Sequence, residues 1–107
     1  IPKEVAKVTW LNVGRMNIKS LEGIKYFTSL EKLICYYTPL VSLDVSGCKA
    51  LKELYCNHNT SLVSLDVCGC TSLERLYCYN TSLSELDVTG CRALECLRCY
   101  DNTSLAS

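Results

Sequence analysis

Tyrosines that recur at fixed spacings could give this 107-residue chain a binding surface. Tyrosine supplies a large, stiff and amphipathic contact area, which suits binding surfaces. The alternative is that the rings stack between neighbouring strands and only stabilise a sheet. Tyr37 is expected at the rim of this face, and His58, the only histidine, in a nearby turn. The candidate ligand-binding residues are Tyr36, Tyr55, Asn57, Tyr77, Tyr79, Arg98 and Tyr100.

Nine cysteines could form disulfides, but their spacing predicts buried thiols. Seven of them recur at two positions, Cys35, Cys56, Cys78 and Cys99 at one and Cys48, Cys70 and Cys91 at the other. Stacked residues of successive coils lie about 5 Å apart with parallel side chains, and this orientation does not suit the dihedral angle of a disulfide. We therefore expect ladders of reduced, inward-facing thiols. Cys68 and Cys96 fall outside both ladders, so they should face water and react first.

Other groups that could carry chemistry have a simpler structural explanation. Asp44, Asp66 and Asp87 share one repeat position, where a carboxylate column could bind Ca²⁺ or could accept hydrogen bonds from turn backbone N–H groups. The phase of the repeat favours the turn. Cys96 and Cys99 form a lone CxxC pair that lacks the second pair of ligands a zinc site needs. The sequence therefore predicts no metal, no cofactor and no enzymatic activity.

The elements that position these side chains are repeated coils. Residues 51–72 read LKELYCNHNTSLVSLDVCGCTS, and the pattern returns in residues 30–50 and 73–93, in a divergent copy over residues 8–29 and in a partial copy over 94–107. A fixed period of 21 or 22 residues is the signature of a solenoid. Residues 1–7 are an N-terminal stub or a partial cap.

Each coil is predicted to carry a strand at its LxCxx segment and a second extended run at LDVxG, with parallel pairing between coils. The first repeat instead favours a helical or 3₁₀ return arm over residues 18–27. Stacking would place three outward columns on the LxCxx face: Lys32, Glu53, Arg75 and Cys96; Ile34, Tyr55, Tyr77 and Arg98; Tyr36, Asn57, Tyr79 and Tyr100.

Asparagines after the LxCxx strand are expected to bond the backbone of neighbouring coils. Asn59 and Asn102 are in phase for this role, Thr38 and Thr81 replace them elsewhere, and Asn80 comes one residue early. The three Asn-Thr-Ser sequons at 59, 80 and 102 are then by-products of the repeat, and only Asn80 should be accessible.

The motif LxxLxCxxN followed by LxxLDVxGC resembles the nested, IRREKO-like subclass of leucine-rich repeats, and IKSLEGIKYFTSLEKL is similar to the internalin-type repeats of bacterial surface proteins. The match covers residues 8 to 105. The resemblance implies a leucine-rich repeat solenoid with parallel strands, of the α/β class or mainly β. It further implies a cell-surface or extracellular location, and a non-catalytic module of a larger bacterial protein that binds a protein or carbohydrate ligand.

The overall charge argues against two classes of partner. Eleven acidic residues balance eleven basic ones, so no general field favours nucleic acid or an anionic membrane surface, and no apolar run reaches membrane-spanning length. The chain ends inside a repeat without a polar cap. We expect that the natural protein continues. The alternative is a structural module that self-associates end to end through its open strand edge.

Overall fold

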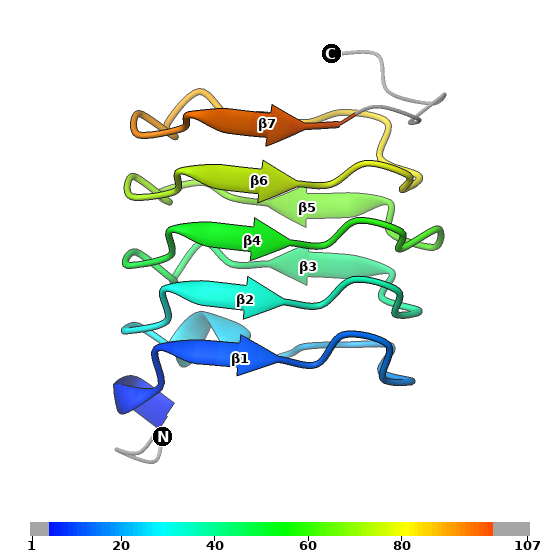
Figure 1. Ribbon diagram of the computed structural model, residues 1–107, viewed down its shortest axis with the longest axis horizontal. Coiled ribbons are helices and arrows are strands. Elements are labelled where there is room, and N and C mark those ends of the chain that lie inside the picture. The colour runs from blue at the N-terminus through cyan, green and yellow to red at the C-terminus, as the bar shows by residue number, and fades with distance from the viewer. Residues whose placement is uncertain (1–4, 100–107) are drawn as a thin grey trace.

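A computed structural model describes residues 5–99 and stacks them as a parallel β-solenoid (Figure 1). One long side of every coil contributes a short strand to a five-stranded parallel sheet with the order β1-β2-β4-β6-β7. The strands of this sheet are β1 (Trp10–Asn12), β2 (Lys32–Ile34), β4 (Glu53–Tyr55), β6 (Arg75–Tyr77) and β7 (Cys96–Arg98). The fold class predicted from the repeat period is confirmed, and the described chain is mainly β.

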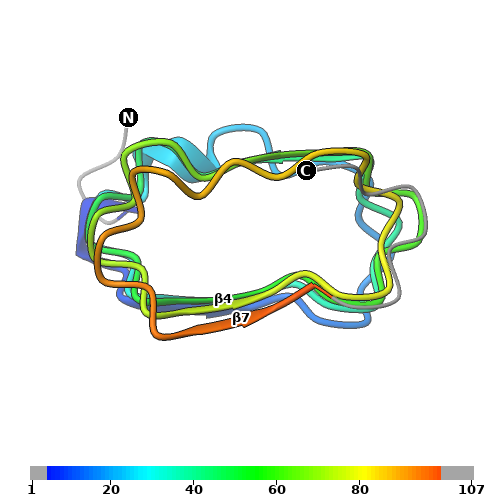
Figure 2. The same ribbon diagram turned by 90° about the horizontal axis from the view of Figure 1, so that it is seen from above.

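The opposite long side of the coils is less regular (Figure 2). Strands β3 (Ser42–Asp44) and β5 (Ser64–Asp66) form a two-stranded parallel sheet there, as the LDVxG pattern predicts. The first repeat replaces the strand with the 3₁₀ helix η2 (Ile24–Tyr26), so the predicted 3₁₀ return arm is confirmed over these residues. A second 3₁₀ helix, η1 (Val5–Lys7), precedes β1.

The third copy of the return run departs from the prediction. Residues 85–87 do not pair with β5 as a strand. Leu86 and Val88 are only half-buried, whereas Val45 and Val67 at the phase of Val88 are buried. The predicted parallel pairing of the second extended run is therefore wrong for the coil of residues 73–93, where the inward side chains are less well covered.

Leucines at equal phases fill the space between the two long sides. The central residues of β2, β4 and β6, namely Leu33, Leu54 and Leu76, are fully buried, while their neighbours on each strand are less covered. A fully buried leucine contributes about 1.5–3 kcal/mol to the free energy of folding. Because each leucine packs against its equivalents in adjacent coils, the core exists only when coils are stacked.

The coils differ in length without losing register. Leu33 pairs with Leu54, 21 residues later, and Leu54 pairs with Leu76, 22 residues later. The extra residue lies in the turn after Asn59, where Thr60 and Ser61 are both exposed. The turn absorbs the difference, so the strands on both long sides remain aligned.

Asn59 turns inward as its repeat phase predicts. It is fully buried, its Oδ1 accepts the Thr38 N–H at 2.6 Å, and its Nδ2 donates to the Cys35 carbonyl at 3.0 Å. The hydroxyls that replace it in other coils act more locally: Thr38 Oγ1 donates to the Cys35 carbonyl and Thr81 Oγ1 to the Cys78 carbonyl, each at 3.0 Å. Asn102 lies outside the described residues.

All nine cysteines are free thiols, as the ladders predict. In the second ladder each thiol reaches the backbone of the preceding coil. Cys48 Sγ donates to the Ile24 carbonyl at 3.2 Å and Cys70 Sγ to the Val45 carbonyl at 3.3 Å. Cys68 is exposed as expected, whereas Cys96 is half-buried and therefore more covered than the sequence suggested.

Within residues 5–99, no helix has the length and apolar character needed to cross a membrane.

Candidate functional site

The five-stranded sheet aligns the predicted columns on its outer face. Ile34 pairs with Tyr55, Tyr55 with Tyr77 and Tyr77 with Arg98, so this column forms as expected. The same register continues down to β1, where Asn12 pairs with Ile34 and Trp10 with Lys32. These β1 members were not among the predicted site residues, although the phase of the first repeat could have revealed them.

Five of the seven candidate residues surround one depression of about 370 Å³, which we call the tyrosine hollow. It is lined by Lys32, Ile34, Tyr36, Tyr55, Asn57, Tyr77 and Tyr79. Arg98 does not line the hollow, but its guanidinium lies over the Tyr77 ring, 4.7 Å from the ring centroid. Tyr100 lies outside the described residues.

The hollow exists because one column alternates in size. Asn57 occupies the position that Tyr36 holds in the preceding coil and Tyr79 in the next, so a short side chain lies between two rings. Gly14 continues the column below Tyr36, and a Cβ atom at Gly14 would lie only 2.8 Å from the Tyr36 ring. The glycine thus leaves room for the Tyr36 ring next to the backbone of the first repeat.

Six aromatic rings follow one another around Asn57. Their consecutive centroid separations are 5.8 Å for Tyr36–Tyr37, 4.3 Å for Tyr37–His58, 5.1 Å for His58–Tyr79, 6.2 Å for Tyr79–Tyr77 and 4.8 Å for Tyr77–Tyr55. We call this arc the aromatic horseshoe. Aromatic pairs at such separations are stabilised by about 0.5–1.5 kcal/mol beyond their buried area, so the arc is a preformed surface whether or not it binds a ligand.

Four residues next to the hollow hold a left-handed backbone conformation that the repeat pattern did not predict. Arg15, Tyr37, His58 and Asn80 have φ between 54° and 65°. Left-handed non-glycine residues cost about 1–3 kcal/mol each and cluster at functional sites. These residues occupy one repeat phase and form a stack: the Arg15 guanidinium lies 4.4 Å from the Tyr37 centroid, and His58 Nδ1 lies 2.8 Å from Asn80 Nδ2.

The stack shows where His58 and Asn80 lie, two residues that the repeat motif does not specify. His58 lies in a turn, as expected, but its ring also belongs to the aromatic horseshoe, and Asn80 is the equivalent of His58 in the next coil. Asn80 is half-buried rather than fully accessible. A shared spacing of 21 or 22 residues between positions 15, 37, 58 and 80 was the signal that could have identified the stack.

Cations cover ring faces at the margin of the horseshoe. Besides Arg15 and Arg98, Lys32 Nζ lies 5.7 Å from the Tyr55 centroid. The acidic neighbour in this register is Glu53, whose Oε1 accepts a hydrogen bond from the Tyr55 hydroxyl. Burial, followed by this bond to a carboxylate, raises the pKa of Tyr55 to about 12. The Tyr55 hydroxyl therefore stays protonated at neutral pH and acts as a donor to Glu53.

Asn57 has the one buried side-chain oxygen or nitrogen without a hydrogen-bond partner in the described chain. The side chain is 5% exposed, and its Oδ1 pairs with no donor. Leaving a buried acceptor unpaired costs about 1–3 kcal/mol. The hollow therefore has an unsatisfied polar atom among its lining residues.

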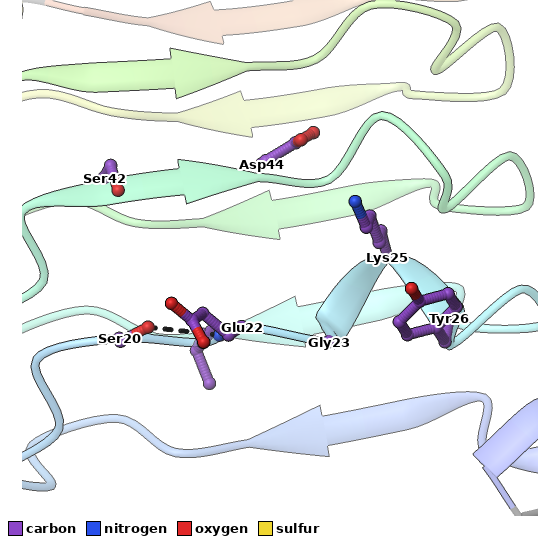
Figure 3. Close-up of a pocket in the computed structure, with 8 residues that line it drawn as sticks. Ser20, Glu22, Gly23, Lys25, Tyr26, Ser42 and Asp44 are labelled. Atoms are coloured by element: carbon purple, nitrogen blue, oxygen red, sulfur yellow. Dashed lines mark hydrogen bonds between the residues drawn. The ribbon is translucent and has the colours of Figure 1, made fainter. Parts of the chain in front are cut away.

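A second hollow of about 410 Å³ lies on the opposite side, where η2 meets β3 (Figure 3). Its polar lining includes Glu22, Lys25 and Asp44, and Figure 3 shows Lys25 extending towards the coil of Asp44. Hydrogen bonds from Ser46 lower the pKa of Asp44, and Lys25 adds a smaller effect. This carboxylate is held in its ionised form, so it is a poor proton donor at neutral pH.

The aspartate column acts in turns, as its repeat phase indicates. Asp44, Asp66 and Asp87 each accept the backbone N–H two residues later through Oδ1, at 2.9 Å in all three cases. Across residues 5–99, no three His, Cys, Asp or Glu side chains converge in a way that could hold a metal ion.

Comparison with known proteins identifies the fold. No protein-family model and no curated protein matches the chain. Among solved structures, the fold is similar to the functional domain of InlJ from Listeria monocytogenes, which includes a cysteine ladder. The TM-score is 0.53 at 23% sequence identity, over 89% of this chain and 26% of that one, so the match spans about a quarter of the solved InlJ chain. The chain therefore has an internalin-type leucine-rich repeat fold, a parallel β-solenoid built from coils of about 22 residues.

Proposed function

We propose that this chain is a non-catalytic binding module that recognises a protein or glycan through the aromatic face of its five-stranded sheet. The observation that carries the proposal is the aromatic horseshoe around Asn57, with the tyrosine hollow at its centre. Tyrosine and arginine are enriched among residues that dominate binding energy, and this face presents both. The proposed setting is a larger bacterial surface or secreted protein, supported by the likeness to InlJ and by the resemblance of the first repeat to internalin repeats.

The strand face favours binding over pure stacking for two reasons. A face built only for stability would satisfy its buried polar atoms, whereas Asn57 Oδ1 is unpaired. It would also avoid left-handed residues, which lie at four equivalent positions beside the hollow. Unpaired acceptors and unfavourable backbone conformations are retained when a site is preorganised for a ligand.

The test is a selection of short random peptides, together with a screen of immobilised glycans, against the complete chain. The Tyr55→Ala/Tyr77→Ala double variant should bind the recovered ligands at least about tenfold more weakly, because truncation of a dominant aromatic contact costs about 2 kcal/mol or more. The matched control is Val41→Ala/Val63→Ala, which truncates two side chains that are 50% and 52% exposed on the opposite side.

The circular dichroism spectrum and the melting temperature of both double variants establish that the fold is intact. Ligands that bind the tyrosine variant as tightly as the unaltered chain, or that lose affinity only for the valine variant, contradict the proposal.

A further inference from the structure

We propose that the tyrosine hollow and the cations around it bind an acidic polypeptide segment of a protein partner. This inference rests on the proposed function, because it assigns a ligand class to the same face. Three observations indicate which ligand this face can bind. They are the shape of the hollow, the unpaired oxygen of Asn57 and the distribution of charged residues on the sheet face.

Charge is unevenly distributed although the chain is neutral overall. The outward columns and the left-handed stack carry Arg15, Lys32, Arg75 and Arg98, while Glu53 is the acidic residue among them and its carboxylate accepts the Tyr55 hydroxyl. Three of these cations lie over tyrosine rings. Complementary charges speed the encounter of two proteins, and like charges disfavour wrong partners. A face with an excess of cations therefore favours an acidic ligand.

The acidic side chains lie on the other flank. Glu31, Glu74 and Glu95 come directly before β2, β6 and β7, and Glu31 pairs with Lys52 at 3.9 Å. The left-handed stack follows the carboxyl ends of the strands. Three glutamates and Lys52 thus occupy the flank before the strands, while Arg15 lies in the stack after them, so the acidic part of a ligand is favoured on the side of the stack and away from the glutamates.

A cationic ligand is the usual occupant of an aromatic cage, and here it is disfavoured. The faces of Tyr37, Tyr55 and Tyr77 already carry the chain's own cations. A bound ammonium group would have to displace a guanidinium or ammonium group and would be repelled by the others. The rings instead hold the cations in place, which reduces the side-chain entropy they lose when they bind an anion.

Asn57 lines the hollow, and its buried Oδ1 has no donor within the described chain. A rotation of the Asn57 side chain would be needed to turn this oxygen into the hollow, where a polypeptide supplies backbone N–H donors at every residue. A sugar also supplies donors, but it is held best on a flat ring platform. The rings here are tilted by 73° for Tyr55–Tyr77 and 50° for Tyr77–Tyr79, so they form a wedge that suits a peptide.

The inference is tested by titrating the isotope-labelled complete chain, observed by NMR, with soluble probes of equal length. The probes are peptides of alternating Ser and Glu, Ser and Lys, and Ser and Gln, and an oligogalacturonate as an acidic glycan. The Ser–Glu peptide should shift the signals of Asn57 and its neighbours and bind more weakly at high salt. The Ser–Lys and Ser–Gln peptides should leave those signals unchanged.

Variants link the binding to the residues on this face. Lys32→Gln and Arg98→Gln should each weaken the Ser–Glu peptide by about two- to fivefold, the range for exposed charge pairs. The matched controls Lys49→Gln and Arg92→Gln make the same charge changes at exposed positions in the turns between the two long sides, and they should have no effect. Asn57→Tyr should fill the hollow and abolish the shifts, and Asn57→Ala provides a second variant if the first does not fold.

Three results would overturn the inference: equal binding of the Ser–Lys or Ser–Gln peptide, binding of the oligogalacturonate but not of the Ser–Glu peptide, or equal affinity of the hollow variants and their controls. The absence of any Ser–Glu binding also refutes it. The proposed function is tested separately, by the Tyr55→Ala/Tyr77→Ala variant. Selected peptides that need Tyr55 and Tyr77 but carry no negative charge would support the binding module and reject the acidic ligand.

Discussion

Two asparagines, two residues apart in the same coil, have opposite roles. Asn59 satisfies the Thr38 N–H and the Cys35 carbonyl of the preceding coil. Asn57 is almost as buried, yet its Oδ1 has no partner. The two side chains are alike in type and burial, but only Asn59 accepts a hydrogen bond from the backbone through its Oδ1. Asn59 therefore stabilises the fold, whereas Asn57 belongs to the candidate site.

Substituting each asparagine by leucine, which has a similar volume, should therefore give opposite results. Asn59→Leu leaves a buried N–H and a buried C=O unpaired and should lower the free energy of unfolding by about 2–4 kcal/mol. Asn57→Leu removes an unpaired acceptor and should leave this free energy unchanged or raise it by about 1 kcal/mol. Urea denaturation measures both. A large loss of stability in Asn57→Leu would show that this amide is structural.

The sequence could predict Asn59 but not the meaning of Asn57. The role of Asn59 follows from its repeat phase, since an inward residue there meets the backbone of the preceding coil. Asn57 was correctly placed on the face, but the hollow depends on the orientation of the rings that line it beside Asn57, among them Tyr36 and Tyr79. The orientation of each ring is set by its packing against neighbouring coils, and the sequence of a single repeat does not encode that packing.

At the scale of elements, two cysteine ladders run along the stacked coils at inward positions. Thiols at 48, 70 and 91 donate to carbonyls of the preceding coil. Periodicity predicted these ladders, because each cysteine lies at an inward phase. Periodicity did not predict the missing strand at residues 85–87, where the LDV pattern is intact but Leu86 and Val88 are less covered. Pattern identifies the inward residues and cannot show how completely they are buried.

Buried thiols should make the protein sensitive to alkaline pH. Burial raises the pKa of Cys35 and of Cys78 from the ordinary value of 9.0 to about 12. Below about pH 9, folded and unfolded chains both keep these protons, so the stabilisation is fully present. As pH rises from about 9 towards 12, only the unfolded chain releases them, and the free energy of unfolding falls by up to about 1.4 kcal/mol per pH unit for each thiol.

Urea denaturation in a phosphine reductant at about pH 8, 9 and 10 measures this slope. Cys35→Ala should reduce the slope by the contribution of one thiol, whereas the control Cys68→Ser, at an exposed position, should leave it unchanged. A free energy of unfolding that is constant over this range, or an equal effect of both substitutions, would refute the assignment of the slope to buried thiols.

At the scale of the whole molecule, stability depends on neighbours along the stack. Leu54 is fully buried between β2 and β6, whereas Leu97 in β7, at the same repeat phase, is 40% exposed. Leu54→Ala should lower the free energy of unfolding by about 3 kcal/mol, because it removes a buried side chain and leaves a cavity. Leu97→Ala should lower it by less than about 1 kcal/mol.

Thermal denaturation followed by circular dichroism compares the two leucine variants. The melting temperature should fall several degrees further for Leu54→Ala than for Leu97→Ala. Equal losses would mean that the coils do not depend on being covered from both sides, which is the basis of the solenoid core.

The turn at Thr60 and Ser61 is a place where the chain tolerates an additional residue. One additional residue there leaves Leu54 and Leu76 paired and leaves the Asn59 contacts in place. Foreign segments spliced into this loop should consequently be displayed at the edge of the stack without altering either sheet, since longer exposed loops add little to the free energy of closure. The scaffold can thus acquire new recognition elements by insertion at its edge while the leucine interior keeps its spacing.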